Sequence, residues 1–244
     1  MDLEPLITNC GENMFWKNAR KKYPDVSKDD PDIVYYFEIL DQLQDSIYNG
    51  LTGKIQDIGH RFVSRFTKEG KTLEIGFGNG RQARFYKGVP ENYYPTDLNV
   101  NLMNDENWKR FKNSQIADAR NLPFADSFFD QVVSIYNLEH ISELEKVLLG
   151  VKRVLKPDGR FYVALPCEDG LAWNLGREFT SRRRFIKNHN LNYDKVIAFE
   201  HCYCLREVIE QLESHFKARK KRFYPFFIPS INLNLIYCAE YIHK

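Results

Sequence analysis

A glycine-rich turn between a predicted strand and a predicted helix constrains this chain more than any other feature. Residues 73–75 form a short, mostly apolar run, and Gly76, Gly78 and Gly80 follow it at alternate positions. Glycines in such a turn let the backbone approach a ligand closely. The spacing differs from a dinucleotide fingerprint, and no Gly-Lys-Ser/Thr follows, which excludes a phosphate-binding P-loop. Taken alone, the glycines are also compatible with a tight turn that binds nothing.

Two acidic residues follow the glycine turn at even intervals. Asp97 lies 21 positions after Gly76, at the end of the next predicted strand, and Asp118 lies another 21 positions on, after a third. The first acid can accept both hydroxyls of a ribose, and the second can accept an exocyclic amine such as that of adenine. Each acid alone is typical of a helix cap or a solvated loop. Together with the glycines they predict a nucleoside pocket along the carboxyl ends of adjacent strands.

Strand and helix patterns alternate between residues 72 and 165, which predicts a mostly parallel sheet covered on both faces. Two amphipathic helical patterns precede this region. Within it, a capping box from Ser142 to Glu145 is expected to begin one helix, and residues 156–159 predict a turn. Two β-like runs, near 216–224 and 232–241, close the chain.

Composition excludes several classes of protein. The 244 residues are 43% hydrophobic, which is enough for a core, and a net charge of +2 disfavours a nucleic-acid coat. The five cysteines are odd in number and form no CxxC pair, so reduced thiols in the cytosol fit better than a disulfide framework or a zinc ribbon. The N-terminus does not resemble a signal peptide. The most apolar stretch, 223–242, is interrupted by proline, asparagine and glutamate, so no membrane span is expected.

These motifs resemble those of the class I S-adenosylmethionine-dependent methyltransferases, of the broad small-molecule group that includes the ubiquinone/menaquinone-biosynthesis methyltransferases. The resemblance runs from about 71 to 165 and is carried by segments 74–80, 97–98, 118–124, 127–130, 137–141 and 154–159. It implies an α/β fold with a Rossmann-like, seven-stranded, mostly parallel sheet whose last strand is antiparallel. The methyltransferase domain would span 71–244, with N-terminal helices in 1–70 as a lid. Residues 166–202 would form an acceptor cap inserted after the fifth strand.

The family resemblance also implies a cofactor, S-adenosylmethionine, and a role for each matching position. The glycines would pass under its methionine part, Asp97 would hold the ribose, and Leu98 would pack on the adenine. Asp118 and the backbone of Ala119 would contact the adenine edge, and Asn137 would lie near the sulfonium. The complete set of implied cofactor-binding residues is Glu74, Gly76, Phe77, Gly78, Gly80, Asp97, Leu98, Asp118, Ala119 and Asn137.

Methyl transfer is a single in-line displacement, so positioning can supply much of the catalysis. A general base is needed only when the acceptor must lose its proton early, as a hydroxyl does. His140 follows the fourth strand and His201 ends the insertion, and both are candidate bases. The alternative for His140 is a helix-start residue bonded to the backbone. No metal site is predicted, because the cluster around His201, Cys202 and Cys204 is too compact.

The insertion 166–202 is much longer than an ordinary strand–helix loop and rich in apolar residues, which favours a folded cap over the acceptor. Its arginines are candidate ligands for an anionic acceptor, although a run of charges is also typical of a solvated face. These arginines are Arg177, Arg182, Arg183 and Arg184. In the N-terminal region, aromatic side chains could stack on the cofactor or simply pack the helices. They are Phe15, Trp16, Tyr35 and Tyr36.

The sequence therefore predicts a cytosolic enzyme that transfers a methyl group from S-adenosylmethionine to a small molecule or a glycan precursor, by O-methylation. The motifs do not identify the acceptor molecule, but the arginines of the insertion predict an anionic one. Alternatives are a non-catalytic module that binds S-adenosylmethionine or a nucleoside, an N-methyltransferase, an NAD(P)-dependent oxidoreductase and an RNA methyltransferase. The charge balance and the lack of a recognisable RNA-binding segment disfavour the last.

Overall fold

The computed structural model describes residues 22–48, 51–67, 69–168 and 170–244. These residues divide into two compact units. The first, called here the sheet unit, comprises residues 58–165, 207–222 and 238–244. The second, called the helical unit, comprises the described residues up to Asp57 together with 166–206 and 223–237.

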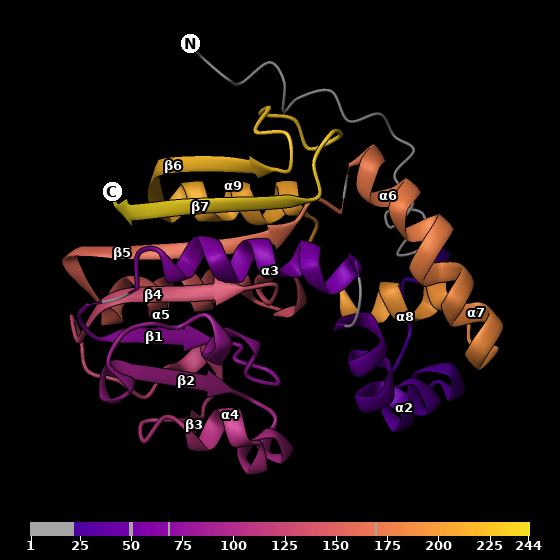
Figure 1. Ribbon diagram of the computed structural model, residues 1–244, viewed down its shortest axis with the longest axis horizontal. Coiled ribbons are helices and arrows are strands. Elements are labelled where there is room, and N and C mark those ends of the chain that lie inside the picture. The colour runs from indigo at the N-terminus through magenta and orange to yellow at the C-terminus, as the bar shows by residue number, and fades with distance from the viewer. Residues whose placement is uncertain (1–21, 49–50, 68, 169) are drawn as a thin grey trace. The chain divides into compact units, whose positions relative to one another are not determined.

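The sheet unit is built on a seven-stranded sheet (Figure 1). Its strands are β1 (Thr72–Ile75), β2 (Tyr93–Asp97), β3 (Gln115–Ile116), β4 (Phe129–Ile135), β5 (Leu155–Pro166), β6 (Phe216–Tyr224) and β7 (Ile236–His243). They lie in the order β3-β2-β1-β4-β5-β7-β6. The pairs β1–β2, β1–β4, β2–β3 and β4–β5 are parallel, whereas β7 runs in the opposite direction. This confirms the predicted fold class.

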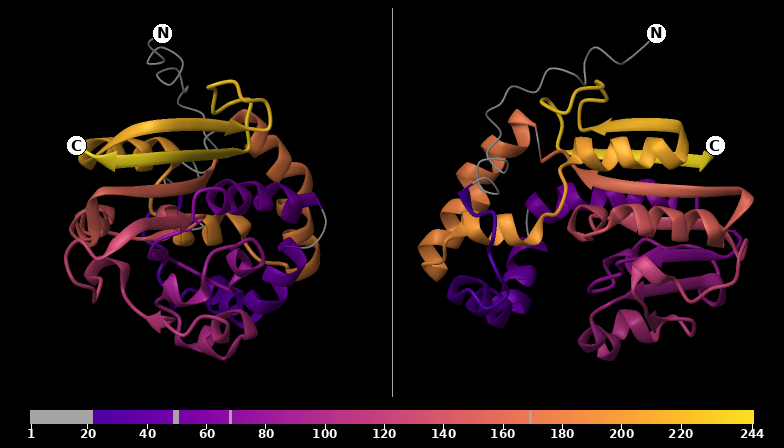
Figure 2. Two further views of the ribbon diagram at one scale, coloured as in Figure 1. Left: turned by 60° about the vertical axis from the view of Figure 1, so that its left-hand side comes forward. Right: turned by 180° about the vertical axis from the view of Figure 1, so that it is seen from behind.

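Helices cover both faces of this sheet (Figures 1 and 2). The second half of α3 (Leu51–Ser64) lies on one face, and α5 (Leu144–Val154) and α9 (Leu205–His215) lie on the other. Just beyond α3, the ring of Phe66 stacks on Tyr162 of β5, with the ring centroids 5.1 Å apart. The apolar side chains of α5 that recur at helical spacing are fully buried against the sheet.

Short helical turns connect the first strands. They are η2 (Arg81–Arg84), η3 (Pro90–Asn92), η4 (Val100–Asn104), α4 (Glu106–Lys109), η5 (Ala119–Asn121) and η6 (Leu138–His140). The helix expected after the glycine turn is therefore a single 3-10 turn, η2. Gly88 and Pro90 follow within a few residues, and both oppose a longer helix.

Two local predictions need correction. The capping box was wrong, because α5 begins after Glu143, which has a left-handed φ of 57° and makes no side-chain cap bond. The predicted turn at 156–159 lies within β5 as a bulge. Phe129 of β4 pairs with Leu155 of β5, and the next pair is Gln131 with Arg160. Residues 156–159 of β5 therefore lie opposite the single residue Asp130 and form the bulge. Lys156 in this bulge forms an ion pair with Asp130 at 2.6 Å.

The helical unit contains α2 (Pro31–Tyr48), α6 (Leu171–Arg177), a π-helical turn η7 (Glu178–Arg182), α7 (Arg183–His189) and α8 (Tyr193–Glu200). Its core joins α2 to the insertion and consists of Ile33, Tyr36, Ile39, Phe185, Leu191, Tyr193, Val196, Ile197 and Cys204. Polar contacts add to this packing. Lys195 of α8 forms ion pairs with Asp30 at 2.9 Å and Asp32 at 3.0 Å. The insertion is thus folded into helices.

The predicted aromatic lid is described in part. Tyr36 is buried in the core of the helical unit, where its ring lies 6.3 Å from that of Phe185, whereas Tyr35 is exposed. Phe15 and Trp16 lie outside the described residues. Among the described helices, none combines the length and the hydropathy needed to cross a membrane.

Candidate functional site

The glycine turn after β1 is held from below by the neighbouring strand β2. Both Gly76 and Phe77 donate their backbone N–H to the carbonyl of Thr96, at 2.9 and 3.0 Å. The Thr96 hydroxyl in turn donates to the carbonyl of Glu74 at 2.8 Å. These bonds place the turn at the carboxyl end of β1, beside the end of β2, where ligands bind in open α/β sheets.

Side chains from α4 support the outer part of the turn. Trp108 donates its indole N–H to the carbonyl of Gly78 at 2.8 Å, and Asn107 donates to the carbonyl of Asn79 at 3.0 Å. Phe77 points away from the turn into an aromatic cluster, where its ring lies 5.2 Å from that of Trp108. Phe77 is therefore buried, and its backbone is the part that a ligand in the turn could contact.

The three glycines have left-handed backbones, with φ of 74°, 55° and 76°, but only two of them are confined by the protein. A Cβ at Gly76 would lie 2.1 Å from Cγ of Asn137, and one at Gly80 would lie 2.3 Å from Cβ of Asn107. A Cβ at Gly78 would meet no atom within 4 Å. Gly78 thus presents an open backbone surface, as a turn that lies under a ligand requires.

Asp97 closes the turn from the end of β2. Its carboxylate accepts from the backbone N–H of Gly78 at 2.9 Å and from that of Asn99 at 3.0 Å. A carboxylate can accept about four hydrogen bonds, so acceptor positions remain for two hydroxyls. Beside it, Leu98 and Val100 expose 64% and 65% of their surfaces. An acid next to exposed apolar side chains suits a group that is part sugar and part flat ring.

Glu74 faces the interior instead of the open side of the turn. It is fully buried on β1, and the hydroxyl of Tyr93 donates to its carboxyl oxygen Oε2. Burial raises the pKa of Glu74 to about 8, and the nearby Asp97 carboxylate acts in the same direction. The carboxyl is therefore mainly neutral at pH 7, and its contacts are with the core beneath the site.

Asp118 caps the turn η5 after β3 and is paired with Arg120. Its Oδ1 accepts from the backbone N–H of Arg120 at 2.9 Å, and the Arg120 guanidinium binds both carboxylate oxygens, the closest at 2.7 Å. This side-chain hydrogen bond holds the pKa of Asp118 below its usual range. Ala119, next along, is half-buried. An amine that contacts Asp118 would share the carboxylate with Arg120.

Tyr136 and Asn137 follow β4 at the same sheet edge. Tyr136 has a left-handed φ of 52°, which is unusual for an aromatic residue and points to a constrained site. Its hydroxyl accepts from the backbone N–H of Gly59 at 3.2 Å. Asn137 lies against Gly76 and donates to the carbonyl of Ile75 at 3.4 Å. The sequence analysis missed Tyr136, and nothing in the local sequence signals its backbone conformation.

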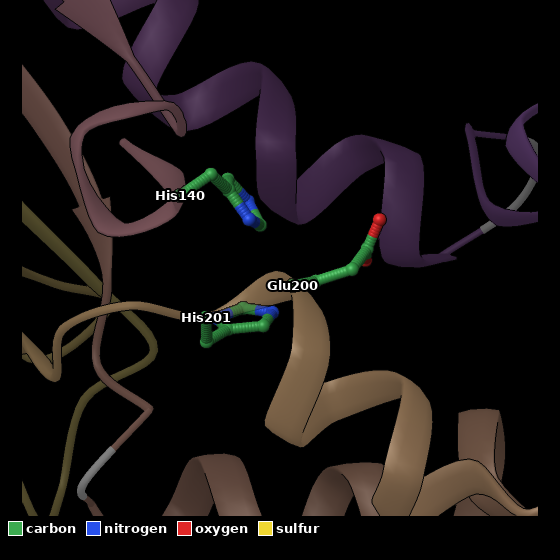
Figure 3. Close-up of side chains that lie close together, drawn as sticks. All are labelled: His140, Glu200 and His201. Atoms are coloured by element: carbon green, nitrogen blue, oxygen red, sulfur yellow. The ribbon is translucent and has the colours of Figure 1, made fainter. Parts of the chain in front are cut away.

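His140 ends the short turn η6 in the sheet unit (Figure 3). Its backbone N–H donates to the carbonyl of Asn137 at 3.0 Å, and its side chain is exposed, with Nε2 3.8 Å from the buried carboxylate of Glu139. The backbone bond agrees with the alternative that His140 starts a helical turn. Its imidazole is exposed to solvent, so it is accessible for proton transfer.

His201 follows α8 in the helical unit, directly after Glu200 (Figure 3). It is buried, and its Nδ1 lies 2.7 Å from Oε2 of Glu168, which is also buried. A carboxylate at this distance from Nδ1 favours the tautomer with a proton on Nδ1, which makes Nε2 the basic nitrogen. The sequence analysis missed Glu168, because 33 residues separate it from His201 in the chain.

The arginines of the insertion have different environments. Arg177 is buried, with its guanidinium 5.8 Å from the centre of the Tyr193 ring. Arg182 forms ion pairs with Glu178 at 2.9 Å and Asp194 at 3.3 Å. Arg183 is exposed and lies over the ring of Phe179. The side chain of Arg184 lies outside the described set.

The sequence is similar to those of known methyltransferases. Residues 73–163 match the family model described as a methyltransferase domain. The Bacillus subtilis protein YrhH is 25% identical over 142 residues, which cover 55% of this chain and 76% of YrhH. The ubiquinone/menaquinone biosynthesis C-methyltransferase of Haemophilus ducreyi is 32% identical over 122 residues, which cover 43% of this chain and 47% of that enzyme. The chain thus spans about half the length of the second relative.

Solved structures share the fold at low sequence identity. A S-adenosylmethionine-dependent methyltransferase of Thermotoga maritima superposes with a TM-score of 0.59 at 17% identity, covering 86% of this chain and 98% of that one. This superposition supports the sheet topology. The family match spans β1 to β5, and so contains the glycine turn, Asp97, Asp118 and Asn137. S-adenosylmethionine is the cofactor that this family uses, and the open face of Gly78, the Asp97 carboxylate and the exposed Leu98 fit it.

Proposed function

Because this chain carries the domain of the class I S-adenosylmethionine-dependent methyltransferases, we propose that it transfers a methyl group from S-adenosylmethionine to the hydroxyl of a small molecule or glycan precursor. The observation that carries the proposal is the open backbone surface of Gly78, bordered by Asp97. Gly76 and Gly80 are packed against side chains, so among the three left-handed glycines of the turn only Gly78 has room for a ligand over its backbone.

Different residues of the chain would contact different parts of the cofactor. Asp97 would accept the ribose hydroxyls through the lone pairs that Gly78 and Asn99 leave available, and Leu98 would cover the adenine. The backbone from Gly76 to Gly80 would lie under the methionine part, with Asn137 beside Gly76. Asp118 and the backbone of Ala119 would contact the adenine edge. When bound, S-adenosylmethionine would supply an electrophilic methyl carbon, which the acceptor attacks in line while S-adenosylhomocysteine leaves with the electrons of the S–C bond.

A hydroxyl acceptor needs a base, and we assign that role first to His201. The buried Glu168 carboxylate would hold the imidazole in one orientation and favour the tautomer whose Nε2 accepts the proton. His201 ends the insertion 166–202 and belongs to the helical unit. His140, which follows β4, is the second candidate base.

An anionic acceptor is the second part of the proposal. Arg177 is its first candidate ligand, because a buried guanidinium binds carboxylate or phosphate more strongly than an exposed one. Arg183 and Arg184 are further candidates, whereas Arg182 would have to exchange its ion pairs with Glu178 and Asp194. We place the enzyme in the cytosol, which fits an odd number of cysteines with no CxxC pair.

A turnover assay tests this function directly. The purified chain is incubated with S-adenosylmethionine and with acceptors that offer a hydroxyl, an amine or a nucleophilic carbon. Each acceptor is tested in a form with a phosphate or carboxylate and in a form without one. Formation of S-adenosylhomocysteine with an anionic hydroxyl compound supports the proposal. Turnover with amines alone would identify an N-methyltransferase, and cofactor binding without turnover on any acceptor would identify a non-catalytic binding module.

The arginine assignment has its own variant test. Arg177→Gln should raise the KM for an anionic hydroxyl acceptor by about 10-fold or more, because one charged hydrogen bond is worth roughly 1.5–3 kcal/mol. The KM for an uncharged analogue of that acceptor and the Kd for the cofactor should change less than about twofold. Lys152→Gln, on α5 of the sheet unit, is the control for loss of one positive charge. An equal rise in KM for charged and uncharged acceptors would contradict the assignment.

A further inference from the structure

Large apolar side chains are exposed on two segments of the helical unit. The first is α6 with the turn and helix that follow it, where Leu171, Leu175, Phe179 and Ile186 are exposed. The second is the loop between β6 and β7, where Phe226, Phe227, Ile228 and Leu233 are exposed. Phe227 exposes 64% of its surface and Phe179 exposes 61%. We call these eight side chains the apolar surface.

The two segments are bonded to each other. Asn232 of the loop accepts, through its side chain and its carbonyl, from the backbone N–H groups of Leu171 and Ala172 at the start of α6. Cys167 also donates its backbone N–H to the carbonyl of Leu235 at 2.8 Å. In both views of Figure 2 the loop lies beside α6. The loop and the start of α6 are therefore joined within this unit.

The loop is built to keep its aromatic residues exposed. Asn234 is fully buried at its centre, donates to the carbonyls of Ile228 and Ser230 at 2.8 Å, and accepts from the backbone N–H of Phe226 at 3.0 Å. Phe227 has a left-handed φ of 61°. A loop that is fixed by a buried asparagine, and still exposes Phe226 and Phe227, is unlike a loop whose apolar residues are exposed by chance.

The exposed apolar residues of α6 and of the start of η7 form a stripe. Leu171, Leu175 and Phe179 follow one another at intervals of four, which places them on one side of the helix. The segment 171–189 contains five arginines and lysines and one acid, Glu178. The loop 225–235 has no charged residue. Exposed Leu and Phe bordered by basic residues are typical of helices that lie in the interface of an anionic bilayer.

We propose that the apolar surface docks the protein on an anionic lipid bilayer, with Phe226, Phe227, Leu175 and Phe179 inserted at the level of the headgroups. The phenylalanines supply apolar area, and the exposed basic side chains of Arg183 and Lys187 attract the anionic headgroups. The apolar side chains that carry the inference are not used by the proposed function, whereas Arg183 is a candidate in both.

Vesicle sedimentation with the full chain tests the proposal. Vesicles of phosphatidylcholine alone are compared with vesicles containing about 30% phosphatidylglycerol, at low salt and at about 0.5 M salt. The protein should partition at least about 10-fold more strongly onto the anionic vesicles at low salt, and high salt should weaken this binding. Equal or absent binding to the two vesicle types would overturn the proposal.

Paired double variants separate the apolar surface from apolar residues elsewhere. Phe226→Ser with Phe227→Ser should lower partitioning onto anionic vesicles at least about 10-fold, and so should Leu175→Ser with Phe179→Ser. The matched control is Val89→Ser with Leu149→Ser, two exposed apolar residues of the sheet unit. Each variant is first shown to bind S-adenosylmethionine with unchanged affinity and to unfold at the wild-type temperature, as evidence of folding.

Two results would count against a membrane. If the control variant lost as much binding as the two test variants, adsorption would not involve the apolar surface. If the wild type without vesicles sedimented as a dimer, and Phe226→Ser with Phe227→Ser made it a monomer, the surface would belong to a second copy of the chain. A monomeric wild type, with losses confined to the test variants, would support the proposal.

Discussion

The glycine turn and the insertion 166–202 are held in place by residues at very different distances along the chain. Gly78 is fixed by Asp97 and Trp108, which are 19 and 30 positions away. In the insertion, Lys195 pairs with Asp30 and Asn192 bonds to Tyr23, which are 165 and 169 positions away. A site whose parts are near in sequence leaves a readable motif, whereas a region assembled from distant segments does not.

The same difference extends to function. The glycine turn resembles a family, and its structure fits the cofactor of that family. The insertion lies beyond the matched residues 73–163 and contains a buried His–Glu pair and a buried arginine. If the glycine turn binds the cofactor, its variants should change the Kd for S-adenosylmethionine. If the insertion binds and activates the acceptor, its variants should change kcat and the KM for the acceptor. The following experiments test this division.

The largest effect is expected at Gly78. Gly78→Asn should raise the Kd for S-adenosylmethionine at least about 100-fold, because the new side chain would occupy the open surface where the cofactor lies. Asparagine tolerates the left-handed backbone, so the fold should survive. Calorimetric titration measures the affinity. Gly176→Asn in the insertion, whose Cβ also meets no atom within 4 Å, should leave it unchanged. Equal affinities for both variants would remove Gly78 from the cofactor site.

The insertion should affect turnover instead of cofactor binding. His201→Ala should lower kcat with a hydroxyl acceptor by about 100-fold, because the proton acceptor is lost, and should leave the cofactor Kd nearly unchanged. Glu168→Gln should lower kcat less, by about 10-fold, if the carboxylate orients the imidazole. His215→Ala is the control. A larger loss with His140→Ala than with His201→Ala would transfer the role of base to His140.

Asp97 provides a graded test of the cofactor region. Asp97→Ala should raise the cofactor Kd by about 10-fold to 100-fold, since a charged hydrogen bond is worth roughly 1.5–3 kcal/mol and the variant also frees the N–H of Gly78. Asp126→Ala, which removes an exposed acid paired with Arg153, is the control for charge. Affinity measured by titration should separate the two variants. An unchanged Kd for Asp97→Ala would exclude this acid from the ribose site.

The smallest effect on cofactor affinity is expected at Glu74, whose contribution is to stability. Because its pKa is raised to about 8, the folded protein retains a proton that the unfolded chain releases near 4.5. Its contribution to stability is complete below pH 4.5 and is lost as pH rises toward 8. The wild type should therefore lose stability relative to Glu74→Gln by up to about 1.4 kcal/mol per pH unit in that window.

Denaturant unfolding at several pH values measures this difference, with the exposed Glu91→Gln as the control. Parallel stability profiles for wild type and Glu74→Gln would show that Glu74 is ionised in the folded protein. The cofactor Kd of Glu74→Gln should stay within about threefold of the wild type, since the side chain faces Tyr93 and the core.

The sequence by itself determined the parts whose information is local or periodic. Alternating strand and helix patterns predicted the parallel sheet, which the structure confirms. The residues Gly76, Gly78, Gly80 and Asp97 predicted a nucleoside site at one end of it, because turn chemistry depends on a few neighbouring residues. The same local rules failed at the start of α5, where Glu143 makes no side-chain cap bond, and at 156–159, where pairing of β5 with β4 made the expected turn a bulge.

Tertiary structure decided which groups the side chains and backbone of these residues contact. It separated Gly78, with its open surface, from Gly76, which is confined by Asn137. It turned Glu74 toward Tyr93, paired Asp118 with Arg120, and brought Glu168 to His201. These outcomes depend on which buried groups meet and on the desolvation of each one, and both depend on contacts between elements. A linear pattern of residue types holds no record of those contacts.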